Sequence, residues 1–171
     1  MLAPKWAHDP LSGAGAASRG GRHNEPGMAA LYMSEQFATA IAEYEQDLGI
    51  RPGTLCAYDV TADQVVDLCD ADTRATASVD PDALRCPWKK IAFIDRARPP
   101  TRDLARRLFD AGASGIRVPS VQAVGGINLV LWRWNDTPDR SIVALDPLND
   151  LPGNQSSWTG EEPRPPVEAD R

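Results

Sequence analysis

The segment 127–134 (INLVLWRW) constrains the fold of this chain most, because it is a strand-length run of apolar and aromatic residues. A second buried-type strand is predicted at 115–118, and Pro119 ends it. Other parts of the chain must complete a sheet built on these two runs. Further runs of strand type occur at 29–33 (AALYM), 54–60, 64–68 and 141–145. Of these, 54–60 and 64–68 are expected to be strands joined by a short polar turn.

Two segments have the spacing of helices. Apolar residues on one side predict the first helix, over about 35–48: Phe37, Ile41, Tyr44 and Leu48. Ser34 stands where an N-cap is expected and Gly49 where a C-cap is expected. The second helix is predicted over 103–111, with leucines on one side, and Gly112 ends it.

Strands and helices alternate along the chain, but seldom with the strict spacing of a parallel β-α-β fold. The sequence therefore predicts an α+β fold, a single domain over 1–146 with a mixed or antiparallel central sheet. From Pro147 onward the chain is rich in Pro, Gly, Ser and Glu, so the tail 147–171 is expected to be mostly disordered. Residues 9–29 are predicted to form a loop, either a mobile arm or a functional loop.

Composition excludes several classes of protein. The net charge of -6 disfavours a nucleic-acid partner, because binding phosphates calls for a basic surface. Three cysteines without a CxxC spacing, together with only two histidines, disfavour a zinc site and a disulfide framework. The first residues, MLAPKWAHDP, contain no apolar signal region, and no apolar run is long enough for a membrane span. We expect a reduced, soluble, cytoplasmic protein with no bound metal.

Standard catalytic motifs are missing. The glycine-rich stretches match neither GxGxxG nor the phosphate-binding P-loop, and the chain has no HExxH and no GxSxG. Dinucleotide-dependent hydride transfer, zinc hydrolysis and serine hydrolysis are therefore disfavoured.

Four residues remain as candidates for a site. Arg22 lies in a glycine-rich loop (GGRHN), where a guanidinium and exposed backbone N–H groups could cradle a pyrophosphate. Tyr32 lies in the predicted strand after this loop, Glu43 on the polar side of the first helix, and Ser120 after the strand 115–118. Each also has a plain structural explanation, as a solvated charge, a strand residue or a turn serine.

Taken together and in order, these segments resemble the RES family, which is named for an arginine, a glutamate and a serine. The resemblance covers three stretches: residues 5–44, residues 88–120 (WKKIAFIDRARPPTRDLARRLFDAGASGIRVPS) and residues 125–134 (GGINLVLWRW). Within the first stretch, GGRHNEPG, ALYMS and AIAEY match the family's turn, strand and helix. Two positions depart from the pattern: His23 stands where the family has Trp or Phe, and Lys5 where many members have Arg.

The resemblance implies an α+β fold like that of ADP-ribosyltransferase toxins, with NAD⁺ as the substrate in a central cleft. Carried over by position, Arg22, Glu43 and Ser120 are the family's arginine, glutamate and serine, and Tyr32 matches an active-site tyrosine. Glu43, Arg22 and Tyr32 are the expected catalytic residues. The expected NAD⁺-binding set is Arg22, Lys5, Trp6, Tyr32 and Ser120, where Arg22 and Lys5 hold the pyrophosphate, Tyr32 and Trp6 stack on a base, and Ser120 binds the carboxamide or the ribose.

The family also implies an activity and a partner. Members consume NAD⁺ by moving ADP-ribose onto a protein, or by phosphorolysis or hydrolysis. We expect the toxin of a bacterial type II toxin–antitoxin system, a mono-ADP-ribosyltransferase acting on a host protein. The alternatives are an NAD⁺ phosphorylase or glycohydrolase, and a non-catalytic binding module. The expected partner is an Xre-family antitoxin that blocks the cleft.

Overall fold

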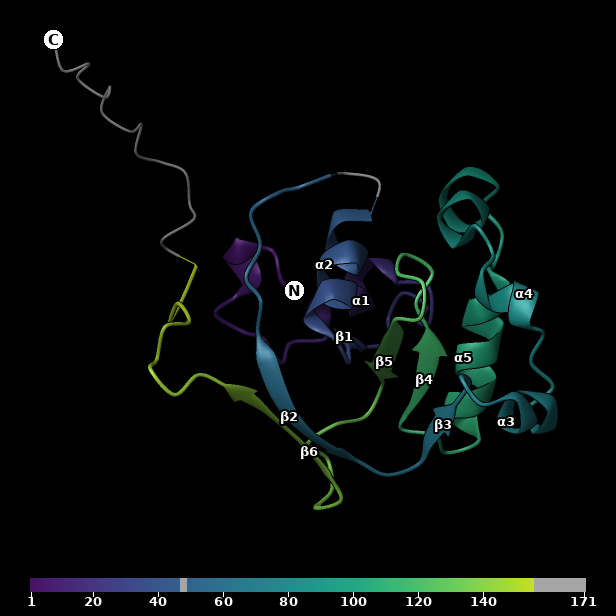
Figure 1. Ribbon diagram of the computed structural model, residues 1–171. Coiled ribbons are helices and arrows are strands. Elements are labelled where there is room, and N and C mark those ends of the chain that lie inside the picture. Colours follow the sequence, from purple (N-terminus) through teal and green to yellow (C-terminus); the bar gives the residue numbers. More distant parts are fainter. Residues whose placement is uncertain (47–48, 156–171) are drawn as a thin grey trace, which may run out of the picture.

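The computed structural model describes residues 1–46 and 49–155. It has an α+β fold with a mixed central sheet, as predicted (Figure 1). The sheet has the order β1-β5-β4-β3, made by Leu31–Ser34, Ile127–Leu131, Gly115–Pro119 and Val65–Asp67. β5 is antiparallel to both β1 and β4, whereas β3 runs parallel to β4.

A second sheet of two strands was not expected. β2 (Ala57–Ala62) pairs antiparallel with β6 (Arg140–Leu145) and not with β3, so the strands predicted at 54–60 and 64–68 belong to different sheets. The turn between them explains this outcome. Gln64 has a φ of 51°, Asp63 accepts hydrogen bonds from Ser114 and Arg140, and the chain is thereby led out of one sheet into the other.

The second sheet packs on one face of the central sheet, and helices cover the other face. The main one is α5 (Pro100–Asp110), which begins with proline at its first position and ends before Gly112, whose φ is 98°. Two shorter helices line the same side, α3 (Ala71–Thr76) and α4 (Pro81–Leu84). A π-helical turn, Lys90–Ile94, precedes α5. At the N-terminal end the chain forms a 3-10 turn, Pro4–Trp6, and α1 (Ala14–Arg19).

The sheet separates two apolar cores. The larger core lies between the sheet and the helices, where Leu104 and Leu108 of α5 pack with Ile116 and Val130. The smaller core joins β1 and β5 to the second sheet through Leu31, Leu131 and Ile142. Alternation along β5 therefore directs Val130 to the helices and Leu131 to the second sheet, as the two faces of a strand require.

Several predicted boundaries are wrong in detail. The region 9–29 is not a continuous loop, because it contains α1, whose C-terminal carbonyls accept hydrogen bonds from Asn24 and Gly27. The first predicted helix is α2 (Phe37–Glu45), and its N-cap is Gln36. Ser34, the predicted N-cap, is instead the last residue of β1. Leu48 lies outside the described residues. β5 ends at Leu131, three residues before the predicted end.

The predicted tail can be followed only in part. Residues 147–155 contain neither helix nor strand, and Asp146 accepts hydrogen bonds from the backbone N–H groups of Asp150 and Leu151. Residues 156–171 lie outside the described part of the chain, so the expected disorder of 147–171 stays a prediction.

Candidate active site

One end of the central sheet carries the candidate site. The register places Ser34 of β1 opposite Asn128 of β5, and Asn128 opposite Val118 of β4. α2 follows β1 directly and so returns over this end of the sheet, while Ser120 follows the last residue of β4. Segments far apart in sequence therefore bring polar side chains to the same edge.

The loop with Arg22 is fixed by Asn24, which is fully buried. Its amide nitrogen donates to three backbone carbonyls, those of Ala16, Glu25 and Met28. Its amide oxygen accepts a hydrogen bond from the hydroxyl of Tyr32, at 2.7 Å. The side chain thus joins α1, the loop and β1 through both its amide nitrogen and its amide oxygen.

Arg22 is half-buried at the wall of a cavity. Its Nη1 donates to the carbonyls of Leu84, at 3.1 Å, and Cys86, at 2.8 Å. Within residues 1–46 and 49–155, Nε and Nη2 donate to no protein group, so both are oriented and available to an anion. Burial lowers the pKa of Arg22 from its usual value, partly offset by the neighbouring groups, among them Glu43. An arginine stays charged under such a shift.

Arg102 of α5 holds the loop of Arg22 by a hydrogen bond to its backbone. Its side chain is buried, its Nε donates to the carbonyl of Gly21 at 2.9 Å, and its guanidinium lies 5.6 Å from the ring centre of Trp88. Arg102 could not be singled out from the sequence, because an arginine in an amphipathic helix is usually a solvated charge. Its burial follows from the loop packed over it.

Tyr32 extends from β1 across the sheet end. Its hydroxyl accepts a hydrogen bond from the backbone N–H of His23, at 3.0 Å, besides donating to Asn24. The hydroxyl is enclosed, although 43% of the residue's surface is exposed, because the ring turns toward the cavities. Burial raises the pKa of Tyr32 far above its usual value, so the hydroxyl stays protonated. This geometry leaves the ring for stacking and commits the hydroxyl to structure.

Glu43 does not face solvent as a residue on the polar side of a helix ordinarily does. One of its oxygens, Oε1, accepts a hydrogen bond from the hydroxyl of Ser120, at 2.7 Å, and another from the amide of Asn128, at 2.6 Å. Neither donor is charged, so neutral hydrogen-bond donors hold the carboxylate in place. Ser120 thus positions Glu43 in this structure, and its oxygen also accepts from two backbone N–H groups that follow it.

Asn128 is a member of the site that the sequence analysis missed. It sits in the run INLVLWRW, where a lone amide interrupts an apolar strand, and that interruption was the available signal. The hydroxyl of Ser34 donates to its Oδ1 at 2.7 Å, which orients the amide nitrogen toward Glu43.

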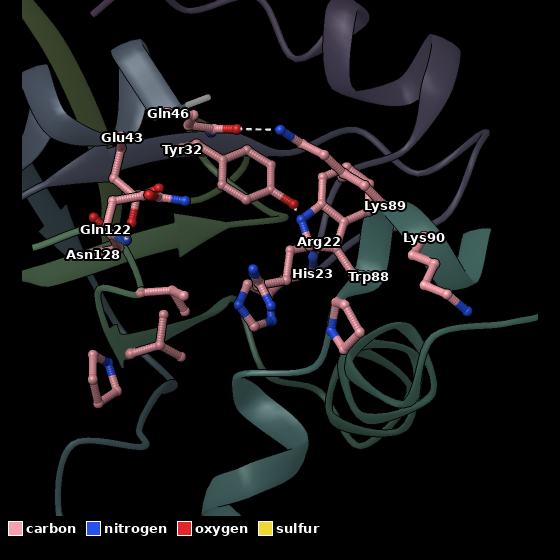
Figure 2. Close-up of a pocket in the computed structure, with 15 residues that line it drawn as sticks. Arg22, His23, Tyr32, Glu43, Gln46, Trp88, Lys89, Lys90, Gln122 and Asn128 are labelled. Atoms are coloured by element: carbon pink, nitrogen blue, oxygen red, sulfur yellow. Dashed lines mark hydrogen bonds between the residues drawn. The ribbon is translucent and has the colours of Figure 1, made fainter. Parts of the chain in front are cut away.

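Side chains from the loop of Arg22, from β1, from α2 and from β5 surround one cavity of about 410 Å³ (Figure 2). Arg22, Tyr32 and Glu43 all line it, together with His23, Trp88 and Asn128. At the mouth, Lys89 donates a hydrogen bond to Gln46, so the segment before the π-helical turn is joined to the end of α2 (Figure 2). The structure therefore brings three of the predicted residues to one cavity and places Ser120 directly behind Glu43.

Lys5 and Trp6 lie elsewhere. They line a second cavity, of about 720 Å³, between the N-terminal turns and β1, and the ammonium of Lys5 stands 5.3 Å from the ring centre of Trp6. Tyr32 lines both this cavity and the first. A third, smaller cavity is bordered by Tyr32, Glu43 and Asn128. The predicted residues thus form two groups with Tyr32 between them.

Two further findings concern the described residues alone. No three His, Cys, Asp or Glu side chains among them are grouped as a metal site requires. Every helix within residues 1–46 and 49–155 is too short or too polar to span a bilayer.

Fold and cavity together define a class: an α+β domain in which an oriented arginine and a buttressed carboxylate line the same cleft at a sheet end. The chain belongs to the RES domain family, whose model matches residues 2–152. That family is associated with NAD-utilising toxins. No curated protein matches this chain.

Proposed function

We propose that this protein cleaves the bond between nicotinamide and ribose in NAD⁺ and transfers the ADP-ribose to an acceptor, in the first place a protein side chain. The observation that carries the proposal is the placement of Glu43. Two uncharged donors, Ser120 and Asn128, hold its carboxylate on the wall of the cavity that Arg22 also lines.

The chemistry of the bond explains why such a carboxylate suffices. Nicotinamide in NAD⁺ carries a positive charge and leaves as a neutral molecule, so no acid has to protonate it. The ribose carbon then acquires the character of an oxocarbenium ion in the transition state. A carboxylate fixed beside the ribose stabilises this developing positive charge, and it can also orient the attacking group. We assign this role to Glu43.

Binding of the rest of the substrate is assigned to Arg22, Tyr32, Lys5 and Trp6. The free Nε and Nη2 of Arg22 suit a phosphate oxygen pair, because a guanidinium binds such pairs through two parallel hydrogen bonds. Two cavities that share Tyr32 suit a dinucleotide, with the reacting half beside Glu43 and the adenosine half beside Trp6. Lys5 then supports the phosphates as a point charge. Contact between Ser120 and the substrate stays a prediction.

The decisive experiment uses the purified full chain, free of any partner, and NAD⁺ labelled in its adenylate half. The assay compares the wild type, Glu43→Gln and Glu45→Gln, each with and without inorganic phosphate and cell proteins. Glu45 lies two residues further along α2 and lines none of the described cavities, so it controls for the loss of one charge. We expect Glu43→Gln to lower turnover on the order of 100-fold with a smaller change in KM.

The fate of the label identifies the acceptor. A labelled protein band that depends on Glu43 supports an ADP-ribosyltransferase. Free ADP-ribose, or its 1″-phosphate when phosphate is present, supports instead a glycohydrolase or phosphorylase. NAD⁺ that stays intact in every reaction, or normal turnover by Glu43→Gln, contradicts the proposed function.

We also propose an Xre-family antitoxin as the partner that closes the cleft. Apolar side chains at the cavity mouth support a protein partner: Val121 lines the cavity and is exposed, and exposed Phe93 packs its ring on that of Trp88. Co-expression of the candidate antitoxin should suppress NAD⁺ consumption and yield a complex on gel filtration. Two separate peaks with undiminished activity would exclude this partner.

A further inference from the structure

His23 is the least explained side chain in the cleft. Only 4% of its surface is exposed, and it lines the first cavity beside Val118 and Pro119. Both of its backbone groups are fixed, since its N–H donates to the hydroxyl of Tyr32 and its carbonyl accepts from the indole of Trp132, at 2.8 Å. The direction in which the imidazole leaves the backbone is therefore set by the fold.

In the described part of the chain, the imidazole of His23 has no hydrogen-bond partner. Nδ1 is fully enclosed and has no hydrogen bond, and Nε2 forms none with any residue in 1–46 or 49–155. A buried polar atom without a partner destabilises a folded protein, and native structures contain few of them. A phenylalanine would fill this place without that cost. The nitrogens are therefore explained best by a partner that enters with the ligand.

The charge state of His23 limits the chemical groups that can bind to it. Burial, and secondly the positive charge of Arg22, lower the pKa of His23 to about 3, so the ring is neutral near pH 7. A neutral imidazole offers one N–H donor and one acceptor nitrogen, and it suits an uncharged polar group. The two ring orientations related by a half turn fill the same space, so either nitrogen can be presented to the cavity.

The neighbours of His23 leave one part of the substrate for it. Arg22 suits the phosphates and Glu43 the ribose, while Val118, Pro119 and the planar indole of Trp88 provide apolar walls. An aromatic ring with a single uncharged polar substituent fits such walls. Both bases of NAD⁺ have this description, but His23 lines the same cavity as Glu43, where the proposed function places the reacting half, so nicotinamide with its carboxamide is the base within reach.

We propose that His23 is a specificity-determining residue that hydrogen-bonds the carboxamide of the nicotinamide ring. This inference rests on the proposed NAD⁺ cleavage and names the part of the cleft that recognises the leaving group. On this proposal His23, and not Ser120, binds the carboxamide, because the hydroxyl of Ser120 already donates to Glu43.

The test compares two substrates in two enzymes. The substrates are NAD⁺ and an analogue in which a methyl group replaces the carboxamide, and the enzymes are the wild type and His23→Phe. We expect His23→Phe to lower kcat/KM for NAD⁺ on the order of tenfold and to leave the analogue within about twofold. The different intrinsic reactivity of the two leaving groups cancels when the substrate ratios of the two enzymes are compared.

A matched control and a second readout keep the outcome clear. Val118→Ala changes an apolar part of the same wall and should affect both substrates alike. Independently of turnover, titration with free nicotinamide should shift the imidazole ¹⁵N signals that disappear in His23→Phe. Equal losses for both substrates in His23→Phe, or imidazole signals that nicotinamide leaves unmoved, overturn the inference while wild-type turnover upholds the proposed function. A wild type that does not consume NAD⁺ overturns both.

Discussion

At the residue scale, Gly21 illustrates how tightly the loop of Arg22 is packed. A Cβ at this position would lie 2.7 Å from the amide oxygen of Asn24 and would overlap the hydroxyl of Tyr32. Backbone and side chains around Gly21 are held by several hydrogen bonds, so none of them can yield cheaply. Glycine is required here by space and not by a left-handed backbone.

Gly21→Ala should therefore separate the loop from β1. We expect a loss of about 1–3 kcal/mol in the free energy of unfolding, because overpacking forces neighbours to move. KM for NAD⁺ should rise as well, because Arg22 moves with the loop. Urea denaturation and NAD⁺ kinetics measure the two effects. Gly153→Ala is the control, since within residues 1–46 and 49–155 no atom beyond its chain neighbours lies within 4 Å of the added Cβ. Equal behaviour of both variants would contradict the packing argument.

A second prediction at this scale concerns pH and His23. The folded protein holds this ring neutral down to a pKa of about 3, whereas an unfolded chain protonates it near 6.5. As the pH falls below 6.5, His23 binds a proton in the unfolded state but not in the folded state, so the free energy of unfolding decreases. Between pH 7 and pH 5 this one group should lower the free energy of unfolding by about 2 kcal/mol.

The comparison with His23→Phe isolates that contribution. Other titrating groups act in both proteins and cancel when the pH dependences are subtracted. Denaturation at both pH values should give a flatter dependence for His23→Phe. Parallel curves for the two proteins would show that the buried ring takes up a proton freely.

Individual residues also mark how far sequence reasoning reaches. Arg22, Tyr32 and Glu43 could be proposed as members of one site, because their order and spacing resemble those of a family. Asn128 could not be placed beside Glu43 in the same way, since 85 residues separate the two and the pairing register decides their meeting. Lys5 and Trp6 fell in a separate cavity for a similar reason: local sequence does not show on which side of Tyr32 the N-terminal turns fold.

At the scale of elements, α2 and α5 contrast in what their apolar residues do. α5 buries Leu104 and Leu108 in the main core. α2 buries Thr39, and 71% of the surface of Phe37 is exposed. Helical periodicity predicted both helices correctly but could not tell which face of α2 the sheet covers. That choice depends on Glu43, whose bonds to Ser120 and Asn128 turn the polar side inward.

This contrast can be measured by truncating one side chain in each helix. Phe37→Ala should change the free energy of unfolding by no more than about 0.5 kcal/mol, as is usual for exposed positions. Leu104→Ala should cost about 2–5 kcal/mol, because it leaves a cavity in the main core. Chemical denaturation of both variants provides the values. A large loss in Phe37→Ala would mean that the apolar stripe of α2 is covered in solution.

The second sheet shows where element-level prediction ends. The strands themselves were recognisable from their residues, yet β2 pairs with β6 some 80 positions later and not with its neighbour β3. Asp63 lies at the branch point, held by Ser114 and Arg140. A polar turn is compatible with a hairpin and with a crossing between sheets, so local sequence leaves the pairing open.

At the scale of the whole molecule, the net charge of the chain and the basic residues of the cleft have opposite effects on an anionic substrate. The chain carries a net charge of -6, which repels an anionic dinucleotide at long range. The cleft itself is lined by three basic residues, Arg22, Lys89 and Lys90, and by one acidic residue, Glu43. Of the three, Lys90 forms an ion pair with Asp95. At about 0.1 M salt the screening length is about 10 Å, so the nearby basic groups should outweigh the distant acidic ones.

Accordingly, KM for NAD⁺ should rise as NaCl is increased from low to physiological ionic strength, by roughly twofold to fivefold. Steady-state kinetics at several salt concentrations tests this, with sucrose as an uncharged control for solution effects. A KM that falls with added salt would show that the net negative charge governs association.

The cleft also has a consequence for synthesis. Arg22 is anchored by carbonyls 62 and 64 residues further on, and Glu43 by side chains 77 and 85 residues further on. A ribosome releases the N-terminal part of a chain first, so both charged groups emerge long before the groups that hold them. A nascent chain, or a fragment from interrupted translation, that stops before Ser120 has the acidic side chain without its support. The complete cleft can form only when most of the domain has been made.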